Sequence, residues 1–207
     1  MMRAMLRQVC TLAFVLAVGS SPAAAQSVPA CTPSTATHQR LMMKTRPEPA
    51  TLAASDITTH TIADIVKLAV PRGKILTDAV IDPHEDETVQ VTGFVRLVKL
   101  SGDDCDLHIQ LGAFPDKHVP QIIAEIPPGE TATRKALAAI LGVKIHAPDG
   151  KPIPFDGPKA VKIKVTGRLF NDSSHFAKDH PKTGNNHGSG VATLWEVHPV
   201  WRVERAP

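Results

Sequence analysis

The chain contains no tyrosine, and aromatic residues make up only 4% of it. Proteins that bind single-stranded nucleic acid stack bases on aromatic side chains beside a basic groove. The segments predicted below as the second and third strands, residues 104–111 and 121–126, contain no aromatic residue. The excess of basic over acidic residues is also small, because the formal net charge of the 207 residues is +3. Nucleic acid is therefore not expected as a partner.

Several catalytic signatures are missing as well. The sequence has no Gly-rich phosphate loop, and no serine, histidine and aspartate set or cysteine and histidine set in a recognisable nucleophile context. After residue 25 it has no apolar stretch of the ~20 residues that a membrane span needs. The mature chain is therefore expected to be soluble, with no membrane partner.

The first 25 residues have the three-part layout of a secretory signal peptide. Arg3 and Arg7 provide a positive start, residues 11–18 are apolar, and the small residues 23–25 provide a cleavage site. A retained membrane anchor is the alternative, but the apolar run is too short for one. We predict that residues 1–25 are removed and that the protein is periplasmic or secreted. Loss of the two arginines lowers the net charge from +3 to +1.

The remaining length suits one domain with a flexible start. Residues 26–88 are predicted to form an N-terminal arm, which is rich in proline, threonine, alanine and serine up to residue 58. A short helix within it is expected to begin after Thr61, a good capping residue, and to end before Pro71. Residues 89–207 are predicted to form the folded domain.

Three cysteines are present, and Cys10 lies within the predicted signal peptide. Cys31 and Cys105 remain as a pair. An even number of cysteines in an oxidising compartment indicates a disulfide, which here ties the arm to the folded domain. Two unpaired or metal-binding thiols are the alternative.

The alternation of apolar and polar residues predicts a mainly β domain. Gly93 is expected to mark a bulge or bend in the first strand, and residues 131–141 are predicted to form one helix between the third and fourth strands. This order is that of a five-stranded, OB-like Greek-key barrel. An open sheet packed on one helix would give a similar pattern, but Trp195 and Trp201, expected on the inward face of the last strand, favour a filled barrel. The predicted strands are 89–100, 104–111, 121–126, 161–169 and 193–204.

Five segments, in order and spread over most of the mature chain, resemble an uncharacterised secreted bacterial family with an OB-like fold. The resemblance implies a shared fold and brings no activity with it. The segment after His175 is longer here than in that family and contains His180 and His187. The five matching segments are Arg40-Leu-Met-Met-Lys44-Thr45, Asp104-Cys-Asp106-Leu-His108-Ile109, Ile123-Ala-Glu125-Ile-Pro127, Gly167-Arg-Leu-Phe170-Asn-Asp172-Ser-Ser-His175 and Trp195-Glu196-Val-His198-Pro199-Val200.

Acidic and imidazole side chains are predicted to project outward from three strands of the barrel. In an OB barrel the second strand pairs with the third and the third with the fifth, and directly opposed Cβ atoms lie about 4.5–5.5 Å apart. If the register brings these residues level, they form one patch that suits Zn, Mn or Fe or acts as an acid/base pair. The alternative is that outward positions are polar because they meet water. The candidates are Asp104, Asp106 and His108 on the second strand, Glu125 on the third, and Glu196 and His198 on the fifth.

The polar segment 171–190 joins the last two strands, where OB folds commonly border their ligand surface. Asp172 and His175 are further candidate ligands for the same patch. His180 and His187 are more typical of a solvated loop.

The predicted function is that of an exported OB-like domain that binds a small polar ligand or a divalent metal on its outer face. A metal-dependent hydrolase, acting on phosphodiesters with Asp106, His108 and His198 around the ion, is one alternative. A structural or partner-binding protein of the cell envelope is another.

Overall fold

The computed structural model describes residues 30–33, 40–69, 77, 79–115, 120–148, 150–175 and 190–207. The predicted signal peptide and the residues His180 and His187 lie outside these ranges. Within them, strands predominate, as predicted. The strands are β1 (Ile57–His60), β2 (Thr88–Leu100), β3 (Leu107–Gly112), β4 (Gln121–Ile126), β5 (Ile153–Pro154), β6 (Val161–Asn171) and β7 (Val191–Arg205). The helices are α1 (Leu41–Lys44), α2 (Ile62–Lys67) and α3 (Thr131–Leu141), with short 3-10 turns at Ala54–Asp56, Pro83–Asp86, Gly157–Lys159 and Ser173–His175.

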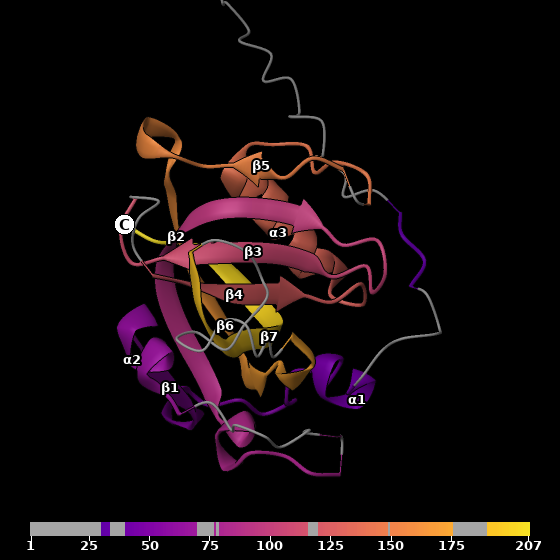
Figure 1. Cartoon of the computed structure of the whole chain (residues 1–207), viewed down its shortest axis with the longest axis vertical. Helices are drawn as coiled ribbons and strands as arrows, with labels where there is room; N and C mark the ends of the chain where they lie inside the picture. Colours follow the sequence, from indigo (N-terminus) through magenta and orange to yellow (C-terminus); the bar gives the residue numbers. More distant parts are fainter. Residues whose placement is uncertain are drawn as a thin grey trace, which may run out of the picture.

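Five of the strands close into a barrel. They follow the order β2-β3-β4-β7-β6, and β6 pairs back to β2 (Figure 1). Neighbouring barrel strands are antiparallel except β4 and β7, which run parallel. The helix α3 lies between the third and fourth barrel strands in the sequence. This arrangement confirms the predicted OB-like barrel with one helix between its third and fourth strands.

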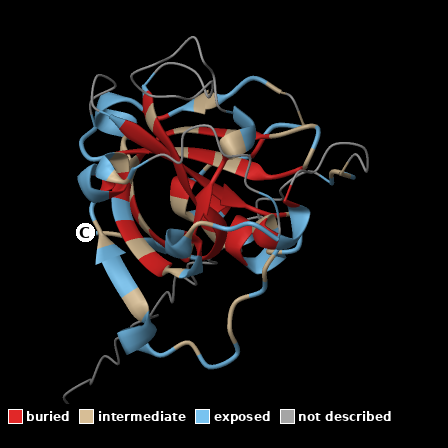
Figure 2. Ribbon diagram, turned by 60° about the horizontal axis from the view of Figure 1, so that its bottom comes forward, coloured by how far each residue is buried: buried red, intermediate tan, exposed pale blue. Residues whose placement is uncertain are grey.

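The barrel interior is filled by the apolar residues that alternate along the strands. Leu107, Ile109 and Leu111 of β3 are fully buried there. The same cluster takes in side chains from α2, including Ile65, and from α3, including Leu137. Figure 2 shows the buried segments concentrated in the barrel strands, with the peripheral turns exposed. Burial of these aliphatic side chains is the main favourable term in the stability of such a domain.

The short helix α2 begins where the sequence predicts and explains Gly93. The Thr61 hydroxyl accepts a hydrogen bond from the Asp64 amide at 3.1 Å, which caps the helix, although the helix ends at Lys67. A Cβ atom at Gly93 would lie 2.8 Å from Cδ1 of Ile62. Gly93 therefore permits close packing of the helix and does not mark a bulge. The irregularity in β2 falls between Val95 and Leu97.

The described part of the predicted arm packs against the barrel. β1 pairs in parallel with β2, and α1 contacts β7. The indole of Trp201 donates a hydrogen bond to the carbonyl of Arg46 at 2.8 Å. The prediction that Trp201 faces inward is wrong, because register irregularities between β6 and β7 change which side chains enter the barrel. Val200 and Val203 join the core instead.

No helix in the described part of the chain is both long enough and apolar enough to span a bilayer.

Candidate metal centre and the adjoining cleft

A row of polar side chains crosses four neighbouring strands on the outer side of the barrel wall. Lys99 of β2 lies opposite His108 of β3, and His108 lies opposite Glu125 of β4. In the parallel ladder of β4 and β7, Ala124 pairs with Val197, and the next residues along the two strands, Glu125 and His198, are in contact. The register therefore brings the predicted acidic and imidazole residues together.

Short contacts link the members of this row. Nδ1 of His108 lies 2.8 Å from Oε1 of Glu125, and Nδ1 of His198 lies 3.0 Å from Oε2 of the same carboxylate. Nε2 of His198 lies 3.2 Å from Oδ2 of Asp106. Glu196 approaches from the same strand, with Oε2 3.8 Å from Nδ1 of His198. One carboxylate thus bridges two imidazoles, and one imidazole lies between two carboxylates.

Asp106 comes from a turn that precedes β3. The strand was predicted to begin at Asp104, but Cys105 has a φ of 63°, in the left-handed region, which interrupts extended structure. The amide of Ser101 donates to the carbonyl of Asp106 at 2.9 Å and closes the turn. β3 therefore begins only at Leu107. The amide of Asp106 donates to Oδ1 of Asp104 at 3.2 Å, so the two acidic residues are directly linked.

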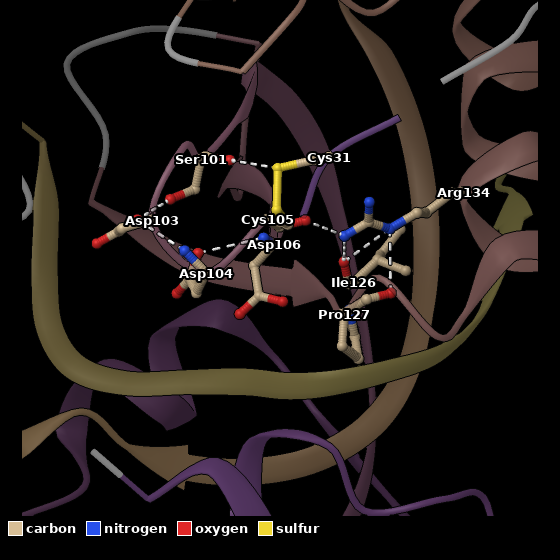
Figure 3. The surroundings of a disulfide bond; sticks show 9 residues. All are labelled: Cys31, Ser101, Asp103, Asp104, Cys105, Asp106, Ile126, Pro127 and Arg134. Carbon is tan, nitrogen blue, oxygen red and sulfur yellow. Dashed lines mark hydrogen bonds between the residues drawn. A yellow bond between two sulfur atoms is a disulfide. The ribbon is translucent and has the colours of Figure 1, made fainter. Parts of the chain in front are cut away.

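The predicted disulfide joins Cys31 to Cys105, with the two Cα atoms 5.7 Å apart. On the other side of the turn, the Arg134 guanidinium donates to the carbonyl of Cys105 and, at 3.0 Å, to that of Pro127. Figure 3 shows the side chain of Asp106 pointing away from the disulfide. The backbone that carries Asp106 is therefore held both by a covalent bond and by a buried arginine.

The N-terminal segment covers this part of the barrel wall. Glu196 and His198 point outward but are 0% exposed. Arg40 and Lys44, at the two ends of α1, lie over the ring of Phe170 at 4.8 and 5.8 Å from its centroid. The Phe170 ring in turn meets the ring of His198 edge-on, with centroids 5.4 Å apart. The polarity of Glu196 and His198 is therefore not explained by contact with water, which was the alternative interpretation.

Burial and mutual contacts set the charge states of this cluster. Burial raises the pKa of Asp106. Burial alone would also raise the pKa of Glu125, but contacts with His108 and His198 hold it well below its usual value. Burial alone would lower the pKa of His198, but Asp106 and Glu125 raise it well above its usual value. The contacts with Asp106 and Glu125 therefore favour the protonated form of His198.

Glu196 is the acidic side chain that the cluster accommodates least well as an anion. Its burial, followed by repulsion from Glu125, raises its pKa to about 7. The three carboxyl groups of Asp106, Glu125 and Glu196 share the two imidazoles of His108 and His198, and Lys44 adds a further positive charge that interacts with Glu125 and Glu196. The charges of the cluster are therefore shared among several partners rather than matched in separate pairs.

Asp106, Glu125 and His198 form a group that could hold a metal ion. Each offers one ligand atom, and these atoms all lie within 4.8 Å of one another. All three residues are buried. Two carboxylate oxygens and one imidazole nitrogen would leave further coordination positions for other ligands.

A cleft of about 380 Å³ adjoins this group. Glu125 and His108 are shared between the cluster and the cleft wall. Lys44 and Lys99 enter from α1 and β2, and the turn before β3 contributes Asp104. The cleft therefore reaches the buried carboxylate of Glu125 from the outside.

The predicted loop candidates Asp172 and His175 also line the cleft. Nδ1 of His175 and the hydroxyl of Ser174 both contact the carboxylate of Asp172. The contact with Asp172 raises the pKa of His175 to about 9 despite partial burial, and holds the pKa of Asp172 well below its usual value although burial opposes this. These two residues form a charged pair at the rim of the cleft, apart from the three-residue group.

All eight predicted site residues thus contribute to the cluster or its cleft. Asp106, Glu125 and His198 form the possible metal group, Glu196 and His108 contact it, and Asp104, Asp172 and His175 lie along the cleft.

Two important residues were not predicted. Lys44 lies in a segment without periodicity, and only the resemblance drew attention to it. Arg134 offered a clearer signal, because it shares the helical spacing of the buried Leu137, Ala138 and Leu141. A charged residue in the apolar stripe of a helix indicates a buried polar partner, which here is a set of backbone carbonyls.

Comparisons with protein-family models, curated proteins and solved structures found no match to this chain, so its function is argued from the site itself.

Proposed function

We propose that this protein is an exported OB-like domain that binds one divalent metal ion through Asp106, Glu125 and His198. The observation that carries the proposal is the convergence of three buried ligand atoms from a turn, β4 and β7. Burying these ionisable groups is costly unless they are paired or coordinate an ion. The gathering of two carboxylates and an imidazole at one buried place supports a cation as the occupant.

The chemistry of the ligands narrows the choice of metal. Carboxylate oxygens and a neutral imidazole suit Zn, Mn or Fe, and the part of the chain that the structure describes offers no free thiolate to select a softer ion, because Cys105 is bridged to Cys31. His198 must lose a proton before it can bind the metal, so metal affinity is expected to fall at acidic pH. His108, held against Glu125 at 2.8 Å, would orient that carboxylate.

Export is part of the proposal. The Cys31–Cys105 disulfide supports it, because such bonds persist in oxidising compartments. The three-part layout of residues 1–25 is the second support. Membership of the secreted bacterial family that the sequence resembles would fit the same location.

Metal titration of chelator-treated protein tests the proposal. We expect one equivalent of Zn, Mn or Fe to bind, measured by elemental analysis and calorimetry. Asp106→Asn and His198→Gln should each weaken binding by a factor of roughly 100 or more, since even residues that only orient a metal ligand typically matter 10–100-fold. Circular dichroism establishes that each variant is folded.

Two control variants separate this site from other histidines. His60→Gln removes the imidazole of a different histidine–carboxylate pair, 3.3 Å from Glu87, and should leave metal binding unchanged. A double variant, His180→Ala with His187→Ala, tests whether any bound metal is held adventitiously by these two histidines instead. If the double variant loses the metal while Asp106→Asn retains it, the proposal is wrong. If folded wild-type protein binds no metal, the structural role in the envelope is the better explanation.

A metal-dependent phosphodiesterase is the second candidate, favoured by the cleft beside the group. Three protein ligands leave a position at which metal-bound water could act. His108 contacts the group and lines the cleft, which places it where a general acid or base would stand. Turnover of a generic phosphodiester by metal-loaded protein, lost in His108→Gln while metal is retained, would select this activity. Stoichiometric metal without turnover would leave a binding function.

A further inference from the structure

The cleft beside the metal group is lined by two lysines that come from different elements. Lys44 is the last residue of α1, and Lys99 stands on β2 opposite His108. The side chain of Lys44 is only 13% exposed. Both line the same cleft of about 380 Å³ that reaches Glu125. Two lysines thus line an opening that reaches one of the proposed metal ligands, Glu125.

The positive charge of Lys44 is stabilised by nearby carboxylates. Its Nζ lies 3.5 Å from Oδ2 of Asp104. Burial alone would lower the pKa of Lys44, but Glu125, Asp172, Glu196 and Asp104 raise it. The positive charge of Lys44 is therefore balanced by several acidic residues rather than by one partner.

A bound divalent cation would change how the positive charge of Lys44 is balanced by the nearby carboxylates. The carboxylate of Glu125 would be neutralised by the metal, and Asp172 is already paired with His175. Lys44 would then face the cleft with less negative charge around it, beside a metal whose coordination three protein ligands do not complete. An anion placed between the metal and Lys44 would satisfy both.

Building on the metal site proposed above, we infer that the cleft binds a small phosphate-type oxyanion together with the metal, with Lys44 as its principal anchor. A tetrahedral oxyanion has enough oxygens to meet a metal ion and an ammonium group at once. Lysine is a common point-charge partner of phosphate. Lys99, on the wall of β2, is in a position to add a second contact.

The inference predicts positive coupling between metal and oxyanion. Because coupling between two binding sites is reciprocal, metal should raise the affinity for phosphate by the same factor as phosphate raises the affinity for metal. We expect a factor of at least about 10, measured by calorimetry with inorganic phosphate on metal-loaded and chelator-treated full-length mature protein. Concentrations must stay below those at which the metal phosphate precipitates.

Lysine variants test the anchor. Lys44→Met should abolish the coupling, while Lys44→Arg, which keeps the charge, should restore much of it. Lys164→Met is the matched control, because Lys164 pairs with Glu204 on strands β6 and β7 through a 2.7 Å contact and does not line the cleft. Metal affinity measured without phosphate shows whether Lys44→Met has left the metal site intact.

The outcomes separate this inference from the proposed function. If the protein binds metal but metal does not change its affinity for phosphate, the inference is overturned and the metal site stands. Coupling that survives Lys44→Met also overturns it. If no metal binds, the proposed function itself fails.

A comparison of inorganic phosphate with glycerol phosphate identifies the source of the oxyanion. The cleft has room for more than phosphate alone, so tighter binding of the ester would indicate an organic phosphate. Equal affinity would indicate free phosphate. Either result is consistent with the inference.

Discussion

Two buried charged clusters lie close together in this protein, and they are built differently. In the first, Glu85 is fully buried against Arg40, with two parallel contacts of 2.6 and 2.7 Å. The amides of Asn171 and Asp82 donate to the same carboxylate at 2.9 Å each. Each oxygen of Glu85 therefore receives two donors, and its charge is matched by one guanidinium.

The second cluster shares its charges. His198 contacts both Asp106 and Glu125, and Glu125 also contacts His108. Glu196 adds a third carboxyl group to the same buried space. The Arg40–Glu85 pair is what a buried ion pair needs for structure alone, whereas the second cluster brings ligand atoms of Asp106, Glu125 and His198 within 4.8 Å of one another, which structure alone does not require. This difference is the strongest general reason to assign function to the second cluster.

The largest expected effect on stability comes from breaking the Arg40–Glu85 ion pair. Glu85→Gln removes the charge that faces the buried guanidinium of Arg40, so the free energy of unfolding should fall by about 3–5 kcal/mol. Chemical denaturation measures it. The double variant Arg40→Met with Glu85→Gln should recover part of the loss, because it leaves no charge buried and keeps a side-chain oxygen that can accept from the amides of Asn171 and Asp82. A double variant as unstable as the single one would show that the pair is not a self-contained unit.

The disulfide should have the next largest effect and should connect stability with the metal. Replacing Cys31 and Cys105 by serine is expected to cost about 2–5 kcal/mol in denaturation experiments. Because Cys105 adjoins Asp106, metal affinity should also fall in the folded variant. Unchanged metal affinity would mean that Arg134, which holds the carbonyl of Cys105, suffices to position Asp106.

A Glu-to-Gln change in the second cluster should raise the free energy of unfolding rather than lower it. Glu196→Gln removes a carboxyl group whose pKa is raised to about 7 by burial and by Glu125. Wild-type stability should therefore decrease as the pH rises from about 4.5, the unfolded value, through 7. The metal-free variant should lack this decrease and be more stable at pH 8 by on the order of 1 kcal/mol. Destabilisation at pH 8 would mean that the ionised carboxylate is needed by its neighbours.

The fold could be predicted from the sequence because the barrel strands alternate cleanly. In β3, Leu107, Ile109 and Leu111 all point into the core, as their spacing indicates. β3 begins later than predicted because Cys105 has a positive φ. The spacing of the cysteine residues in the sequence does not reveal this backbone conformation. Trp201 was misplaced because alternation fails wherever a strand register slips, and such slips depend on the partner strand.

The membership of the site was predictable, but its burial was not. Alternation placed His108, Glu125 and His198 on one face, and the topology of an OB barrel made their strands neighbours. The burial of this face by α1 could not be predicted, because the contact is long-range and α1 comes from a segment whose sequence shows no periodicity. Lys44 could not be assigned to the site from spacing for the same reason.

The smallest predicted effect concerns the pair at the rim of the cleft. The contact with Asp172 raises the pKa of His175 to about 9. Its stabilising contribution should therefore be complete below about pH 6.5, the unfolded value, and disappear as the pH rises through 9. His175→Asn should be less stable than wild type at pH 6 and equal to it near pH 10, by a modest amount because the imidazole is half exposed. NMR titration of the His175 ring gives the pKa directly, and His146→Asn is a control because His146 contacts only a backbone carbonyl, that of Lys151. A His175 pKa near 6.5 would show that the pair is open in solution, and Asp172 would then be a candidate ligand for the cation rather than a partner of His175.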